Sequence, residues 1–405
     1  MHNKKGFNRS KQYKLEESNS SSIRLHKNIV GNKFIIKSGK GVVITDENDR
    51  EYIDFVLGGG SLILGHSNDK VVESIQDTCK RLISFDSATR LELRLSELLC
   101  ETMRNVEMVR MVNSELEAKI CAINLAKRYT KRNKIVRFEG CYEGEFKSLL
   151  LEADLNDTLV CKYNDENQLR ELFKEYGKEI AAVVIEPVAG NIGSIKAEES
   201  FMKKLRMYCD RFGALLIFDE SISGFRVLFN GGQTLFDVKA DLIIYAKILG
   251  GGLPCGAYGG KKNIMELVNE DRTIVANPLV MSAGLATLNQ LYDHPEYYNH
   301  IERIGKKFED GLYKIRDKYN LPIKVNRVGG MMTIFFTDNE NVTSYEDVKK
   351  CDLDRFERYF NHMKENGFNI PKSQFDSLFL STEHNITHIF KFIKAFEEFA
   401  KKEIN

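Results

Sequence analysis

The sequence lacks the features that would direct it to nucleic acid, to a membrane surface or to an oxidising compartment. Its 59 Lys and Arg residues nearly balance 58 Asp and Glu residues, so a formal net charge of +1 offers no global attraction for anionic partners. None of its eight cysteines stands in a C-x-x-C pair, which favours reduced thiols over disulfides or a zinc site. We therefore expect no metal site and no nucleic-acid partner.

Long apolar runs are also absent. The N-terminal residues MHNKKGFNRSKQYK are polar and basic, without the apolar segment of a secretory signal. No other run reaches the length that a membrane-spanning helix needs, so no membrane partner is expected. These features predict a soluble, cytoplasmic protein.

The pattern of apolar runs divides the chain into three predicted parts. Residues 1–60 combine a polar arm with a small antiparallel meander. Strands and helices alternate through 61–290, which predicts an α/β domain with a large, mostly parallel sheet and helices on both faces. Residues 291–405 begin with a long polar helix over 296–319 and complete a smaller α+β domain.

The stretch from Leu215 to Pro254 contains two short apolar runs that each end at an ionisable residue. One run ends at Asp219, and the other is followed by Lys247 and a glycine triplet. Such runs are typical of buried parallel strands. An open α/β sheet builds its site at the carboxyl ends of its strands, so we expect this carboxylate and this amine to meet there.

Lysine and aspartate in this arrangement are the pair that pyridoxal phosphate chemistry uses. Apolar surroundings favour the neutral, nucleophilic amine of Lys247, and Asp219 could hold a protonated ring nitrogen. Tyr142 is placed to stack on the ring, and the N–H groups of 114–116 could receive the phosphate. A buried ion pair is the alternative explanation for Lys247 and Asp219. An ordinary helix start with Ser114 as N-cap is the alternative explanation for the pattern at 114–116.

Nearly the whole chain, from about residue 20 onward, resembles the class III (fold type I) pyridoxal-phosphate aminotransferases. Within that family it is most similar to the glutamate-1-semialdehyde 2,1-aminomutases. The segments that carry the resemblance are RFEGCYEG (137–144), VVIEPVAGNIGSI (183–195), GALLIFDESISGFRV (213–227), AKILGGGLPCGAYGG (246–260) and PKSQFDSLFLS (371–381).

The resemblance implies a role for each matching position. Lys247 would form a Schiff base with pyridoxal phosphate and shuttle the proton, Asp219 would keep the ring nitrogen protonated, and Tyr142 would stack on the ring. Thr273 would reach the phosphate in a partner subunit, which implies a homodimer with shared active sites. The remaining positions implied for the cofactor are Ser114, Glu115, Leu116, Glu186, Asn191 and Ser221, and those for the substrate are Ser21, Arg24 and Gly59.

Departures from the family pattern gather at the site. The family's Ser-Gly-Thr-Glu-Ala phosphate loop is here 114–118, Ser-Glu-Leu-Glu-Ala, so Glu115 brings a carboxylate near the phosphate unless it points away. Ser221 replaces a valine that packs under the ring, and 58–61 replace a segment with an aromatic wall. The long gating segment of the aminomutases is shortened to 151–162.

Three functions remain open at this point. Because the gating segment retains an intermediate in the aminomutases, its shortening favours an intermolecular aminotransferase of a biosynthetic pathway. Such an enzyme would take an amino donor and a keto or aldehyde acceptor in turn, through pyridoxamine phosphate. The first alternative is a glutamate-1-semialdehyde 2,1-aminomutase of tetrapyrrole synthesis. The second is a catalytically degenerate protein that keeps the fold as a binding or scaffold subunit.

Overall fold

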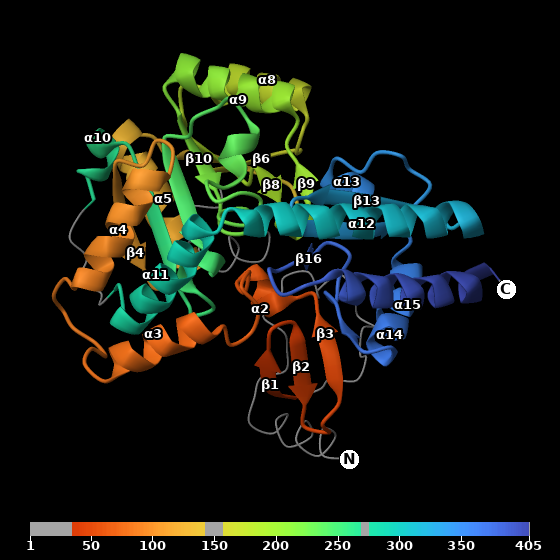
Figure 1. The fold of residues 1–405 in the computed structure, drawn as a ribbon. Coiled ribbons are helices and arrows are strands. Elements are labelled where there is room, and N and C mark those ends of the chain that lie inside the picture. Colours follow the sequence, from red (N-terminus) through yellow and green to blue (C-terminus); the bar gives the residue numbers. More distant parts are fainter. Residues whose placement is uncertain (1–34, 142–156, 269–274, 405) are drawn as a thin grey trace, which may run out of the picture. The chain divides into compact units, whose positions relative to one another are not determined.

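The computed structural model describes residues 35–141, 157–268 and 275–404. The chain forms two compact units (Figure 1). Of the described residues, unit 1 contains 35–68, 296–342 and 346–404, and unit 2 contains 69–141, 157–268, 275–295 and 343–345. Each unit is described by itself below. No helix in the described part of the chain combines the length and the apolar character needed to cross a membrane.

Unit 2 is built on a seven-stranded sheet with the order β4-β12-β11-β10-β7-β5-β6. All neighbouring pairs are parallel except those of β12, which runs antiparallel to β4 and to β11. The strands are β4 Met108–Val112, β5 Lys134–Phe138, β6 Thr158–Cys161, β7 Ile180–Ile185, β10 Leu215–Asp219, β11 Leu242–Ala246 and β12 Gly256–Gly260. The predicted α/β class with a mostly parallel sheet is confirmed.

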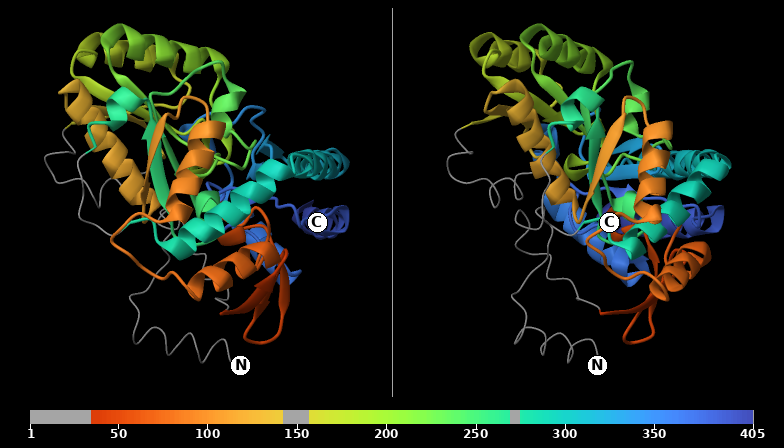
Figure 2. Two further views of the ribbon diagram at one scale, coloured as in Figure 1. Left: turned by 60° about the vertical axis from the view of Figure 1, so that its left-hand side comes forward. Right: turned by 90° about the vertical axis from the view of Figure 1, so that its left-hand side faces the viewer.

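Helices flank this sheet (Figure 2). The helices of this unit are α3 Asp69–Cys79, α4 Arg90–Thr102, α5 Glu115–Thr130, α8 Glu166–Tyr176, α9 Glu199–Phe212, α10 Lys262–Met265 and α11 Pro278–Asp293, and α3 packs on α11. Local sequence fixes several helix ends: Asp165 caps the start of α8, and Gly213 ends α9 in the left-handed region at φ 69°. A two-stranded ribbon of β8 Val188–Ala189 and β9 Ile195–Lys196 completes the strands of this unit.

Strand β12 lies within the large sheet but is not predicted from the sequence pattern, because its glycines resemble a loop. A side chain at Gly256 would place a Cβ atom 2.1 Å from the backbone oxygen of Ser114, and one at Gly260 would lie 2.2 Å from the oxygen of Asp241. Glycine is therefore required by the close approach of neighbouring backbone, which also brings the start of α5 against the sheet.

Unit 1 combines a four-stranded sheet, order β1-β2-β3-β15, with a three-stranded sheet, order β13-β14-β16. Its strands are β1 Ile36–Lys40, β2 Val43–Asp46, β3 Glu51–Asp54, β13 Ile323–Val328, β14 Met331–Phe336, β15 Phe368–Asn369 and β16 Leu378–Phe379. Its helices are α2 Leu57–Gly60, α12 Glu296–Tyr319, α14 Leu353–Glu365 and α15 Ile386–Ile404, and α13 Tyr345–Lys349 begins in unit 2. The predicted meander and the long helix over 296–319 are confirmed.

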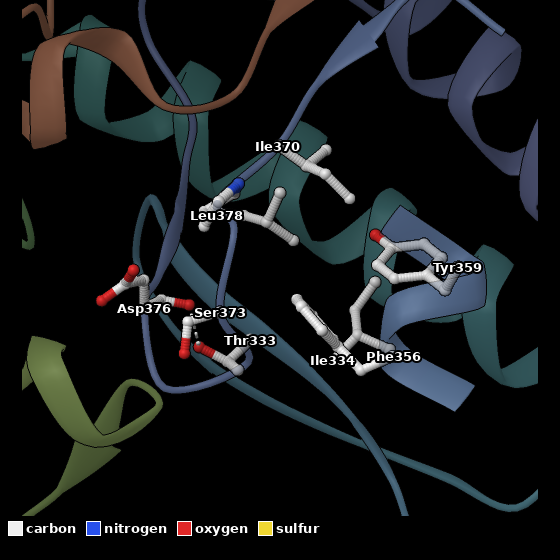
Figure 3. A pocket seen from close by; sticks show the side chains of 9 residues that line it. Thr333, Ile334, Phe356, Tyr359, Ile370, Ser373, Asp376 and Leu378 are labelled. Atoms are coloured by element: carbon white, nitrogen blue, oxygen red, sulfur yellow. Dashed lines mark hydrogen bonds between the residues drawn. The ribbon is translucent and has the colours of Figure 1, made fainter. Parts of the chain in front are cut away.

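An aromatic cluster holds unit 1 together. The Phe55 ring lies 5.8 Å from that of Phe308 and 5.0 Å from that of Phe392. A cavity of about 10 Å³ lies beside β14 and α14, lined by residues that include Thr333, Phe356 and Tyr359 (Figure 3). It has room for about one water molecule, so it is not a candidate cofactor site.

Candidate active site

The carboxyl ends of β10 and β11 deliver the two predicted catalytic side chains. Strands β10 and β11 are parallel neighbours, with Asp219 opposite Ile244. Asp219 is the last residue of β10 and is 1% exposed. Lys247 directly follows β11, adopts a left-handed backbone at φ 50°, and keeps 24% of its side chain exposed. The left-handed backbone conformation costs a lysine about 1–2 kcal/mol, and strained residues of this kind cluster at functional sites.

Asp219 is fixed from two sides. Its Oδ1 accepts a hydrogen bond of 2.9 Å from the backbone N–H of Ser221, and its Oδ2 lies 3.4 Å from the Nζ of Lys119. The Ser221 side chain is also buried, and its Oγ makes no hydrogen bond within the described residues. The carboxylate is thus held in place by backbone and by a cation before any ligand is considered.

The start of α5 supplies a third group. Ser114 caps the helix, with its Oγ accepting a 3.1 Å hydrogen bond from the N–H of Glu117. Glu117 in turn accepts a 2.8 Å hydrogen bond from the N–H of Asn113. The predicted capped helix start is confirmed. Glu115 and Leu116 lie in the first turn, where a helix presents backbone N–H groups to an anion.

A chain of ion pairs joins these three elements. Glu115 Oε2 lies 3.4 Å from Lys247 Nζ, and Glu115 Oε1 lies 2.5 Å from Lys119 Nζ. Lys119 then reaches Asp219, as described above. We call this row of four residues, Lys247–Glu115–Lys119–Asp219, the charge bridge. Lys119 is only 3% exposed, and it is the site residue that sequence reasoning missed. Its spacing of four residues from Glu115 on a helix was the available signal.

The charge bridge determines the ionisation of Glu115. Burial by itself would raise the pKa of this carboxyl, but Lys119 and Lys247 outweigh burial and lower the pKa to about 2. Glu115 is therefore an anion at neutral pH. The sequence predicts weaker cofactor binding unless Glu115 points away from the phosphate. The structure shows its carboxylate turned toward Lys247, and the effect on binding stays a prediction.

Glu186 lies buried just after β7, in the same unit. Its Oε2 accepts a 2.9 Å hydrogen bond from the N–H of Gly190. Burial and the nearby Asp219 raise the pKa of Glu186 to about 8, although Lys119 partly opposes them. The neighbouring Cys141 thiol has its pKa raised well above the ordinary value by burial and by Glu186. Asn191 lies in the short 3-10 helix of 190–192 that begins at this hydrogen bond.

Replacing Glu186 with glutamine should flatten the pH dependence of stability above neutrality. The folded protein holds a proton on Glu186 up to pH about 8, whereas the unfolded chain releases it near pH 4.5. The free energy of unfolding therefore falls as pH rises between these values, by roughly 1.4 kcal/mol per pH unit. Glu220, with a pKa of about 7, contributes a similar slope only up to that pH, so the interval from pH 7 to 8 isolates Glu186.

Urea unfolding of the apo protein at pH 7 and pH 8 measures this effect. We expect the stability difference between the two pH values to disappear in Glu186→Gln and to persist in Glu171→Gln, an exposed control on α8. An unchanged difference in Glu186→Gln would show that another group carries the slope.

The structure brings together only part of the predicted site. Lys247, Asp219, Ser221 and Glu115 are joined by the contacts above. Gly59 belongs to unit 1, where it is exposed with φ 67°, and a Cβ atom at this position would meet no other atom within 4 Å. Tyr142, Thr273, Ser21 and Arg24 lie outside the described residues.

The donor set fits pyridoxal phosphate. Lys247 offers a partly exposed amine to an aldehyde, Asp219 offers a buried carboxylate to a ring nitrogen, and the N–H groups at the start of α5 suit a phosphate. Glu115 and Lys119 are additions to that set. Within 35–141, 157–268 and 275–404, no group of three or more His, Cys, Asp and Glu side chains is placed to hold a metal ion. The fold and this donor set together define a fold type I pyridoxal-phosphate enzyme.

Comparison with known proteins names the family. Residues 26–394 match the model of aminotransferase class-III, and the chain belongs to this family of pyridoxal-phosphate-dependent enzymes. It is 52% identical to a glutamate-1-semialdehyde 2,1-aminomutase of Clostridium botulinum, with all of both chains covered. It is also 52% identical to the protein of that name from Clostridium beijerinckii, covering 98% of this chain and 97% of the relative.

Solved structures agree with this assignment. A β-phenylalanine aminotransferase of Variovorax paradoxus superposes with a TM-score of 0.89 at 26% identity, covering 99% of this chain and 94% of that one. The predicted family, enzyme class and cofactor are confirmed.

Proposed function

We propose that this protein transfers an amino group between two separate small molecules, an amino donor and a keto or aldehyde acceptor. The observation that carries the amino-transfer chemistry is the placement of Lys247 and Asp219 at the ends of the parallel neighbours β10 and β11. Pyridoxal phosphate supplies an electron sink and a temporary carrier for the amino group. Lys247 then holds and moves a proton at its Nζ, and Asp219 fixes a negative charge at the ring nitrogen.

The length of the chain supports transfer between separate molecules. The alignment to the Clostridium botulinum relative spans 427 positions, so at least 22 of them have no counterpart among the 405 residues here. We propose that a shortened gating segment at 151–162 is part of this difference. An enzyme that releases its keto product between half-reactions tolerates a more open site than one that must retain its intermediate.

A second candidate is the reaction of a glutamate-1-semialdehyde 2,1-aminomutase, in which the amino group returns to the same carbon skeleton. The observation in its favour is the 52% identity to proteins of that name over full length. Family membership and the retention of Lys247 and Asp219 speak against the scaffold alternative.

Glutamate 1-semialdehyde separates the two candidates. The purified enzyme, loaded with pyridoxal phosphate, is incubated with this compound with and without an amino donor such as alanine or glutamate. We expect amino transfer to require both a donor and an acceptor. Rapid formation of 5-aminolevulinate from glutamate 1-semialdehyde alone would overturn the proposal in favour of the aminomutase.

The proposal extends to the surroundings of the site. We place the enzyme in the cytoplasm as a homodimer, in which Thr273 of each subunit serves the phosphate of the other. Ser21 and Arg24 would bind the substrate carboxylate, since guanidinium binds it through two parallel hydrogen bonds. Leu116 and Asn191 would line the cofactor through their backbone or side-chain donors.

A further inference from the structure

We propose that the charge bridge occupies the cofactor site from within, so that pyridoxal phosphate must displace Glu115 in order to bind. The inference rests on the proposed use of this cofactor. It gives Glu115, a position already implied for the cofactor, a competing role, and it adds Lys119, which the family resemblance does not supply. Both act on the cofactor's binding groups through charge.

The geometry is that of direct competition. Each group that should receive part of the cofactor already has a partner from the same chain. Lys247, which should meet the aldehyde, lies 3.4 Å from the Glu115 carboxylate. Asp219, which should meet the ring nitrogen, lies 3.4 Å from the Lys119 ammonium. The start of α5, which should meet the phosphate, carries Glu115 itself.

Charge balance makes this competition unfavourable for the cofactor. Two lysines and two carboxylates leave the charge bridge neutral overall without any ligand. A bound phosphate ester brings a charge of about −2 to the helix start that holds Glu115. Repulsion at such short range is strong in a partly buried site, where Glu115 is only 22% exposed. Binding is therefore favourable only when Glu115 leaves Lys247 or loses its charge.

Lys119 opposes the cofactor at the opposite end. Its ammonium faces the carboxylate that a protonated ring nitrogen would need, and two cations cannot share Asp219 without repulsion. Because Lys119 is almost fully buried and its Nζ also contacts Glu115, it cannot move to solvent while the charge bridge is intact. Breaking the contacts of Glu115 therefore loosens Lys247 at one end of the charge bridge and Lys119 near the other.

Glu115→Gln and Glu117→Gln form a matched pair of variants to test the competition. Both remove one negative charge from the first turn of α5 and keep the size of the side chain. Only Glu115 touches the two lysines, whereas Glu117 accepts a hydrogen bond from Asn113, which glutamine can also accept. Apo forms of both variants and of the unmodified protein are titrated with pyridoxal phosphate, and bound cofactor is measured by equilibrium dialysis.

We expect Glu115→Gln to lower the dissociation constant by about tenfold or more, and Glu117→Gln to change it by less than about twofold. Adding Lys119→Met to Glu115→Gln should lower the constant further, because the Lys119 ammonium then no longer competes for Asp219. An unchanged or higher constant in Glu115→Gln would overturn the proposal, and so would an equal gain in Glu117→Gln. If Glu115→Gln fails to fold, Glu115→Ala tests the same contacts in a residue that favours helix.

These outcomes are separate from those of the proposed function. Binding is measured without turnover, so a tenfold gain in Glu115→Gln would stand even if no donor and acceptor supported amino transfer. Conversely, amino transfer by the unmodified protein with an unaltered Glu115→Gln constant would remove only the charge bridge proposal.

Discussion

Replacing Lys247 with arginine is expected to abolish amino transfer while leaving the protein folded. Arginine keeps a positive charge beside Glu115, so it can take the place of lysine in the ion pair with Glu115 at the start of α5. A guanidinium, however, remains protonated at all accessible pH values and is neither a nucleophile nor a proton carrier. Loss of both roles should lower the rate by at least about 10⁴-fold, as for other covalent catalysts.

Two measurements check the effect of Lys247→Arg. The first is turnover with the best donor and acceptor pair, and the second is the visible absorbance of lysine-bound cofactor, which should vanish. Lys261→Arg is the control, because Lys261 forms an ion pair of 2.7 Å with Asp241 in the same unit without touching the charge bridge. Retention of more than about 1% of the activity in Lys247→Arg would show that another group carries the amine chemistry.

Strands β10 and β11, which position Asp219 and Lys247, could be predicted because their signals are local. Strands β10 and β11 are buried along their whole length, so each appears in the sequence as a continuous apolar run that ends at a polar residue. The rule that parallel strands present their carboxyl ends at one edge then brings Asp219 and Lys247 together. Nothing beyond a few neighbouring residues was needed at either position.

Strand β12 and the burial of Lys119 could not be predicted, because their causes lie far away in the sequence. The glycines of β12 are required by backbone oxygens of Ser114 and Asp241, which only the folded sheet brings near. Lys119 lies on a helix rich in charged residues, where a lysine is normally solvent-exposed. Its burial depends on Asp219, one hundred positions further along the chain.

The effect of Glu115 on the site can be inferred only from the sequence and the structure together. Its charge beside a phosphate site was visible in the sequence, but a glutamate side chain in a first turn can also face solvent. The structure settles its direction, since both carboxylate oxygens contact lysines. The helix start that we expect to receive the phosphate is thus already engaged, through Glu115, by two lysines of the same chain.

Asp219→Asn is expected to lower the rate of amino transfer by about 10²–10³-fold, the usual cost of removing a fixed charge from a site. The amide can still accept the hydrogen bond from the Ser221 N–H, so local backbone geometry should persist. The variant also removes an anion that lies 3.4 Å from the Lys119 ammonium. Because a buried cation that loses a partner is destabilising, the thermal midpoint of the apo protein should fall by a few degrees.

The double variant Asp219→Asn with Lys119→Met separates the two effects of Asp219. Because the double variant removes the Lys119 cation together with the Asp219 anion, it leaves neither of these two charges buried without the other. The thermal midpoint should therefore return toward that of the unmodified protein. Catalysis should not return, because the ring nitrogen still lacks its carboxylate. Recovery of the rate together with stability would mean that Asp219 serves only to neutralise Lys119, and its role at the cofactor would have to be abandoned.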